Sequence, residues 1–183
     1  QKNVKSSSNS VGSEVDISTM GGDIHVDEAF NGASVKTMGG DITVNKAKKY
    51  VKAETMGGEI KIKEIDGYIK ATTMGGDVFA KMVGDPDEGR RDVYLSSMSG
   101  DITLYVPEGL SMQVEIEITY GDDEEVNTSD IQSDFEMQTE NIVNNSDNWS
   151  NGSKKLVKTG NINGGKHKVR ISTINGTGKL KKL

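Results

Sequence analysis

The chain repeats one motif along its first half, and the first copy reads Val15-Asp16-Ile17-Ser18-Thr19-Met20-Gly21-Gly22-Asp23-Ile24. Its Thr-Met-Gly-Gly-acidic portion returns three more times with the methionines 18 residues apart, and a fifth copy, Ser-Met-Ser-Gly-Asp, follows after 24 residues. A degenerate copy at residues 172–176 lies near the C-terminus. A fixed period of this length is typical of a solenoid, in which successive repeats stack on one another.

Apolar residues occupy every second position on both sides of the Gly-Gly pair when the repeats are aligned. The column that follows the glycines holds Ile24, Ile42, Ile60, Val78 and Ile102. A further apolar column closes each repeat at Ala29, Ala47, Ile65 and Val83. This alternation, with many β-branched residues in the apolar columns, predicts short strands with one buried face. Glycine pairs at this spacing would interrupt any helix.

The sequence therefore predicts an all-β fold, a single-stranded parallel β-helix (a solenoid) with rungs of about 18 residues. The chain lacks the aliphatic residue at every sixth position that marks left-handed β-helices. This absence favours a right-handed coil.

We expect one domain in three parts. Residues 1–14 form a polar N-terminal tether or cap, residues 15–106 form the regular β-helix repeats, and residues 107–183 form degenerate rungs and the C-terminal cap. Within the third part, residues 169–176 match the repeat and are expected to form the last rung. Whether residues 107–165 cap the solenoid or pack along its side stays open.

Two regions depart from the bare repeat. The insertion at residues 85–91 is charged and rich in turn formers, so it should bulge from one edge without disturbing the stack. Residues 122–140 carry eight acidic side chains and no Lys or Arg, whereas residues 154–183 carry nine Lys or Arg and no carboxylate. The basic region has the charge to meet an anionic glycan or lipid surface, but pairing with the acidic region is the favoured interpretation.

The composition excludes several classes of protein. A net charge of −6 argues against a nucleic-acid partner, and the absence of cysteine removes disulfides, thiol chemistry and zinc–thiolate sites. No apolar run approaches the length of a transmembrane segment. The chain begins at Gln1, as a mature protein does after signal-peptide removal, so we expect an extracytoplasmic location at the cell surface or in the periplasm.

Two columns at the Gly-Gly turn are the candidate interaction residues. The first contains the methionines Met20, Met38, Met56, Met74 and Met98. We favour a corner ladder packed in the core over an exposed contact stripe, because flexible methionine fills irregular space. The second contains the carboxylates Asp23, Asp41, Glu59, Asp77 and Asp101. We expect each of these to bond the backbone of its own turn, with calcium between rungs as the less favoured alternative.

The remaining residues give little support for catalysis. A column of hydroxyls beside the methionines, which starts at Thr19, is expected to be structural. The histidines His25 and His167 are far apart and are expected in outward or terminal positions. We therefore predict no catalytic, cofactor-binding or metal-binding residues. Paired carboxylates leave a polysaccharide-degrading enzyme as a remote alternative.

The registered repeats and the closing segments carry a resemblance to a known family. The segments are the step Ile102-Thr103-Leu104-Tyr105-Val106-Pro107, the turn Asn163-Gly164-Gly165 and the last copy at residues 171–176. Together they resemble the family of bacterial β-strand-repeat proteins described as adhesins. The resemblance covers most of the chain from residue 15 on. It implies a β-helix, an envelope or extracellular setting, and no established catalytic activity.

We accordingly expect a non-enzymatic adhesin-like or interaction module of the cell envelope. Its ligand would be an unidentified protein or glycan, and no cofactor is implied. The alternatives are a periplasmic scaffold or envelope-stress component, and a structural β-helix that self-associates end to end or face to face.

Overall fold

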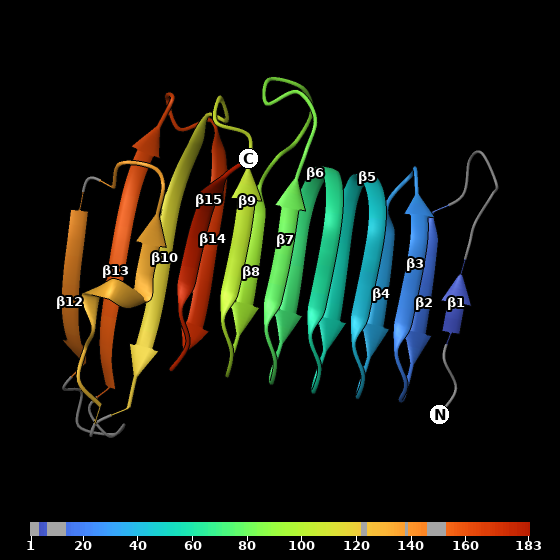
Figure 1. Cartoon of the computed structure of the whole chain (residues 1–183), viewed down its shortest axis with the longest axis horizontal. Helices are drawn as coiled ribbons and strands as arrows, with labels where there is room; N and C mark the ends of the chain where they lie inside the picture. Colours follow the sequence, from blue (N-terminus) through green and yellow to red (C-terminus); the bar gives the residue numbers. More distant parts are fainter. Residues whose placement is uncertain (1–3, 7–13, 122–123, 138, 146–152) are drawn as a thin grey trace.

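The computed structural model describes residues 4–6, 14–121, 124–137, 139–145 and 153–183. These residues form one 15-stranded, mostly parallel sheet that folds round and nearly closes on itself like a flattened barrel (Figure 1). The all-β prediction is confirmed. The strands are β1 (Val4–Ser6), β2 (Val15–Thr19), β3 (Ile24–Ala29), β4 (Ala33–Thr37), β5 (Ile42–Thr55), β6 (Ile60–Thr73), β7 (Val78–Met82), β8 (Val93–Ser97), β9 (Ile102–Val106), β10 (Met112–Tyr120), β11 (Ile131–Ser133), β12 (Thr139–Asn145), β13 (Ser153–Ile162), β14 (His167–Ile174) and β15 (Gly178–Lys182).

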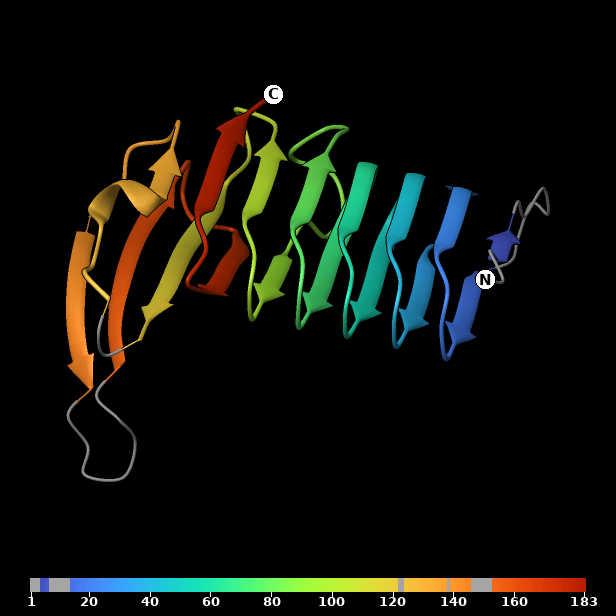
Figure 2. The ribbon, with the colours of Figure 1, turned by 60° about the horizontal axis from the view of Figure 1, so that its bottom comes forward.

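Two layers of strands enclose the core (Figure 2). The layer that we call the β8 face contains β2, β4, the second halves of β5 and β6, β8, β14, β10, β13 and β12. The layer that we call the β9 face contains β1, β3, the first halves of β5 and β6, β7, β9, β15 and β11. A tight turn joins the two layers within each repeat, and it is Gly-Gly in the first four copies, Ser-Gly in the fifth and Asn-Gly in the last.

The first repeats stack in register: residues of β3 and β5 pair with the residues 18 positions on. Ile24 pairs with Ile42, which pairs with Ile60, and the apolar columns are buried along the whole stack. Neighbouring rungs therefore lie about 4.8 Å apart, the spacing of hydrogen-bonded strands. At the N-terminal end, β1 pairs with β3; the rest of the expected tether up to residue 13 lies outside the described residues.

The insertion shifts the register of one strand. On the β8 face Ile69 pairs with Val93, so the stack continues there as predicted. On the β9 face the register shifts by one between β6 and β7, and Met82 takes the buried position opposite Ile65 that the sequence assigned to Val83. The expectation of an undisturbed stack is therefore wrong for β7.

A buried arginine ties the inserted loop to the stack and explains this shift. The Arg91 side chain is 1% exposed. Its guanidinium donates to Asp66 Oδ1 (2.6 Å) and to the carbonyl oxygens of Val83 and Glu88 (both 2.9 Å). Because a buried cation needs all of its donors paired, the backbone of the loop is drawn around it and Val83 leaves the apolar column.

The C-terminal repeat is inserted between strands that precede it in the sequence. β14 pairs on one side with β8 and on the other with β10, and β15 lies between β9 and β11. The prediction that residues 169–176 form the last rung is therefore wrong, because the rung before them in the stack is the fifth repeat and β10 follows them. Figure 1 shows β14 and β15 in red beside the yellow-green β8 and β9.

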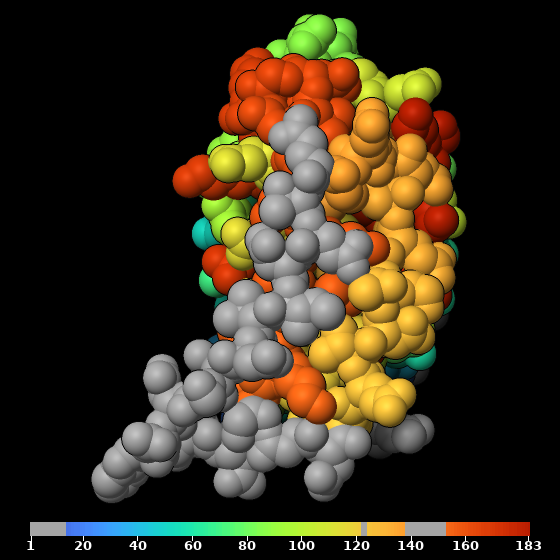
Figure 3. Space-filling view, turned by 90° about the vertical axis from the view of Figure 1, so that its left-hand side faces the viewer, coloured from blue at the N-terminus to red at the C-terminus, as the bar shows by residue number. Residues whose placement is uncertain are grey.

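The described residues between 107 and 165 cap the end of the stack. β10, β13 and β12 extend the β8 face, with β13 antiparallel to both of its neighbours. The 3₁₀ turn Thr128–Asp130 leads into β11, and Ile131 and Phe135 join the core from this region. Figure 3 looks onto this end, where the residues around β11 lie beside β13. The antiparallel hairpin ends the parallel stack and covers its apolar interior.

Candidate binding surface

The hydroxyl column lies inside each turn. Thr37, Thr55, Thr73, Ser97 and Thr173 are buried, and each donates to the carbonyl of the second turn glycine in the preceding rung at 2.7–3.2 Å. The predicted structural hydroxyl ladder is confirmed. It satisfies a carbonyl at a corner where the strand ladder is interrupted.

The carboxylate column links neighbouring rungs. Asp23 Oδ1 accepts from the N–H of Asp41 (3.0 Å), and Asp41 Oδ1 accepts from the N–H of Glu59 (2.8 Å). Asp77 does the same for Asp101 at 2.8 Å. The prediction that each carboxylate bonds its own turn is therefore wrong, since the partner belongs to the next turn. Within the described ranges, no cluster of His, Asp or Glu side chains could hold a metal ion.

The methionine column lies on the outside of the turns. Met20 is 82% exposed, and Met38, Met56, Met74 and Met98 are 45–50% exposed. The prediction of a ladder packed in the core is therefore wrong. The tight turn points the hydroxyl inward and its neighbour outward, so the methionines form an exposed strip that ends at Ile174. Met20 is the most exposed because, among the described strands, β2 has a neighbour on only one side.

The two histidines differ in burial. His25 is half-exposed and pairs with Asp27 at 2.9 Å. His167 is buried, and its Nδ1 accepts the backbone N–H of Arg91 at 3.4 Å. Burial, helped by the charge of Lys166, lowers the pKa of His167. Of the predicted outward or terminal positions, His25 takes an outward one, whereas His167, near the C-terminal end, is buried because the C-terminal repeat enters the stack at this residue.

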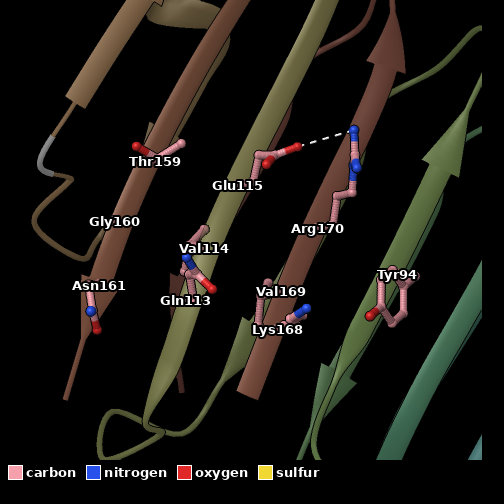
Figure 4. A pocket seen from close by; sticks show the side chains of 10 residues that line it. All are labelled: Tyr94, Gln113, Val114, Glu115, Thr159, Gly160, Asn161, Lys168, Val169 and Arg170. Atoms are coloured by element: carbon pink, nitrogen blue, oxygen red, sulfur yellow. Dashed lines mark ion pairs between the residues drawn. The ribbon is translucent and has the colours of Figure 1, made fainter. Parts of the chain in front are cut away.

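A shallow hollow of about 410 Å³ lies on the outer side of the β8 face, across β8, β14, β10 and β13 (Figure 4). Tyr94 comes from β8, Lys168 and Arg170 from β14, Gln113 and Glu115 from β10, and Thr159, Gly160 and Asn161 from β13. Gly160 pairs with the inward-facing Val114, and a Cβ there would lie 3.2 Å from Met137 Sδ on the inner side, so this residue lines the hollow only with its backbone. The hollow was missed from the sequence because its strands are neighbours in space only.

Ion pairs neutralise the carboxylates in and beside the hollow. Arg170 Nη2 lies 3.1 Å from Glu115 Oε1 and 3.5 Å from Glu117 Oε2, so both carboxylates are engaged by a cation of the same face. Lys155 also binds Glu117, at 2.8 Å. The ammonium of Lys168, by contrast, has no acidic partner within the part of the chain that the structure describes, and it is exposed. The hollow therefore keeps an uncompensated positive charge.

Aromatic rings and cations surround Tyr94. In register, Lys70 lies on one side of Tyr94 and Arg170 on the other. The Tyr94 and Tyr68 rings are 6.2 Å apart, and the guanidinium of Arg90 lies 4.4 Å above the Tyr68 ring. Arg90 is in turn paired with Asp92 at 2.7 Å. The ring of Tyr94 is thus supported from one side and bordered by basic residues.

A comparison with protein-family models matches residues 1–181 to the family described as Toastrack DUF4097. The chain belongs to the Toastrack family. This is a β-rich repeat family of unknown function, so the match agrees with the repeats and leaves the adhesin role unsupported. Neither the curated proteins nor the solved structures gave a match to this Toastrack chain. Its described part contains no helix that is long and apolar enough to cross a membrane.

Proposed function

We propose that this Toastrack chain is a non-enzymatic, adhesin-like interaction module of the cell envelope, built as a right-handed parallel β-helix and located outside the cytoplasm. The observation that carries the proposal is the hollow on the β8 face. A tyrosine ring, amide and hydroxyl groups and a free ammonium line it. A few polar groups around an aromatic surface are the usual composition of a ligand-binding site.

The chemistry of the hollow favours binding over hydrolysis. A glycosidase uses two carboxyl groups about 5–9.5 Å apart, one of which must hold or release a proton. Glu115 is the one acidic residue among those that line the hollow, and Arg170 neutralises it. The lining therefore offers no acid–base pair, and we propose no reaction for it.

Protease treatment of intact cells that express the full-length gene tests the location and the role. We expect an antibody to this chain to lose its signal when intact cells are treated, because an adhesin-like module must be outside the outermost barrier. A periplasmic protein with a known antibody serves as the control for cell integrity. Protection of the chain until the cells are lysed would contradict the adhesin role and would favour the periplasmic scaffold.

The N-terminal end of the stack favours a second candidate, end-to-end self-association. β2 pairs with β4 on one side, and no described strand pairs with its other side. An open strand edge of this kind is a template for another strand. Light scattering over a concentration series tests the candidate: growth of mass with concentration supports assembly, and a constant monomer mass contradicts it.

A further inference from the structure

We propose that the hollow on the β8 face binds acidic saccharides, with Tyr94 as the stacking surface for a sugar ring and Lys168 as the partner of its carboxylate or sulfate group. The inference rests on the proposed function and names the class of ligand for the same site.

The Tyr94 ring is set up to receive a flat, partly apolar ligand. Its contact with Tyr68 holds the ring in place before a ligand arrives, so little conformational freedom is lost on binding. A tyrosine offers an apolar ring face together with a polar hydroxyl. A sugar ring has matching surfaces, because its C–H groups form an apolar face and its hydroxyls form a polar rim.

The charges around the ring select an anion. Lys70 and Arg170 border Tyr94, and Lys168 lies on the same strand as Arg170, two residues before it. The carboxylates nearby are already occupied: Glu115 by Arg170, and Asp92 by Arg90 and by the N–H of Lys168 at 2.9 Å. The ammonium groups of Lys70 and Lys168 therefore remain to attract a negative ligand.

The size of the hollow and the charge of the whole chain limit the ligand to a short acidic segment. A volume of about 410 Å³ lies at the lower end of the range for ligand sites, about 300–1,000 Å³, and suits about one or two sugar rings. The net charge of −6 opposes a long, uniformly charged polyanion such as a nucleic acid. The amide of Gln113 and the hydroxyl of Thr159 lie where they can meet the sugar hydroxyls (Figure 4).

The β9 face provides a matched control. Phe79 and Tyr105 form a ring pair with centroids 5.8 Å apart, and Lys61 and Lys81 are in register with these rings. The local chemistry is similar to that of Tyr94 and Lys70. If lysines and aromatic rings attracted glycans non-specifically, variants of both faces would lose affinity for glycans. If the hollow is the binding site, only the variants in the hollow lose affinity.

Titration of the purified chain with defined oligosaccharides tests the inference. The probes are uronic-acid and sulfated tetrasaccharides, with a neutral glucose tetrasaccharide as the control. We expect the acidic probes to bind, with an affinity that falls as salt is added, and the neutral probe to bind at least tenfold more weakly. Tyr94→Ala and Lys168→Gln should each weaken the acidic probes about tenfold or more, equivalent to about 1.4 kcal/mol. Tyr105→Ala and Lys81→Gln should change the affinity less than twofold.

The outcomes separate this inference from the proposed function. A wild-type chain that binds no acidic probe, or that loses as much affinity in the β9-face variants as in the hollow variants, overturns the inference. Preference for the neutral probe overturns it as well, but leaves the interaction module standing. Lys168→Gln keeps a long polar side chain at an exposed position, so it remains informative if Tyr94→Ala unfolds.

Discussion

Two adjacent residues of each turn point in opposite directions, and this decides what each of them can do. The threonine is buried and bonded to the rung before it, while the methionine is exposed to solvent. The second turn glycine is required for the same reason: a Cβ at Gly40 would lie 2.5 Å from the carbonyl oxygen of Gly22, whereas one at Gly39 meets nothing within 4 Å. The fifth copy can therefore carry Ser99 in the first glycine position but keeps Gly100.

Removal of one ladder hydroxyl should measure the stability of this corner. Thr55 Oγ1 donates to the Gly40 carbonyl at 3.0 Å in a buried site. We expect Thr55→Val to lower the free energy of unfolding by about 1 kcal/mol, because the carbonyl loses its partner. Urea denaturation gives the measurement, and Thr43→Val, on an outward position of the same strand, is the control. Equal effects of the two substitutions would contradict a role for the ladder.

The buried histidine should make the fold sensitive to mild acid. Burial lowers the pKa of His167, with Lys166 acting in the same direction and Asp92 opposing it. The unfolded chain takes up a proton near pH 6.5, and the folded chain does so only at lower pH. The free energy of unfolding should therefore fall as the pH drops below about 6.5, before the carboxylates titrate at about pH 4.

Substitution of His167 isolates this effect. We expect the loss of stability between pH 7 and pH 5 to be smaller in His167→Gln than in the wild type, because the buried imidazole is then absent. Thermal unfolding at several pH values provides the measurement. A wild-type slope that persists in His167→Gln would assign the acid sensitivity to other groups.

At the scale of elements, β14 and β15 connect the repeats to the cap. β10 pairs with β14 and β13, and β11 pairs with β15. None of the cap strands β10, β11, β12 and β13 pairs directly with β8 or β9. The hollow also depends on this arrangement, since β14 brings Lys168 and Arg170 between Tyr94 and Gln113.

Truncation after Gly165 should therefore uncouple the cap from the repeats. We expect the truncated chain to lose cooperative unfolding, because β8, β9, β10 and β11 lose the strands between them. A peptide of residues 166–183 added in trans should restore part of the transition. Removal of only Leu183, which lies beyond β15, is the control. A truncated chain that unfolds in a single transition at the wild-type temperature would contradict this view of the fold.

At the scale of the whole molecule, the stack should tolerate the loss of one complete repeat. Deletion of residues 43–60 joins Ile42 to Lys61 and preserves the alternation of inward and outward residues. We expect this variant to fold, with an unfolding m-value roughly a tenth smaller, because the m-value follows the surface buried on folding.

Deletion of residues 43–61 is the matched comparison. It removes one residue more and places two apolar residues, Ile42 and Ile62, in succession. A shift by one residue exchanges the buried and exposed sides of a strand, so this variant should unfold or aggregate. Circular dichroism and urea denaturation of both variants give the measurement. Similar behaviour of the two deletions would contradict stacking in register.

The strands, the turns and the buried columns of the regular repeats could all be predicted from the spacing of residues in the chain. These follow from the spacing of apolar residues and glycines, because the period of a strand decides which side chains face the core. The hydroxyl ladder followed from the same alignment. The alternation of apolar residues did not predict where the side chains at the turn point. There the turn geometry places the methionine on the outside and bonds the carboxylate to the next rung.

The order of the last strands, the burial of Arg91 and His167, and the hollow depend on contacts between distant parts of the chain and could not be predicted from local sequence. Any strand with the right alternation can pair with any free edge, so local sequence does not specify that β14 lies between β8 and β10. That choice depends on how the whole C-terminal half closes over the end of the core. The candidate site lies across this junction, and its residues become neighbours only when the last repeat enters the stack.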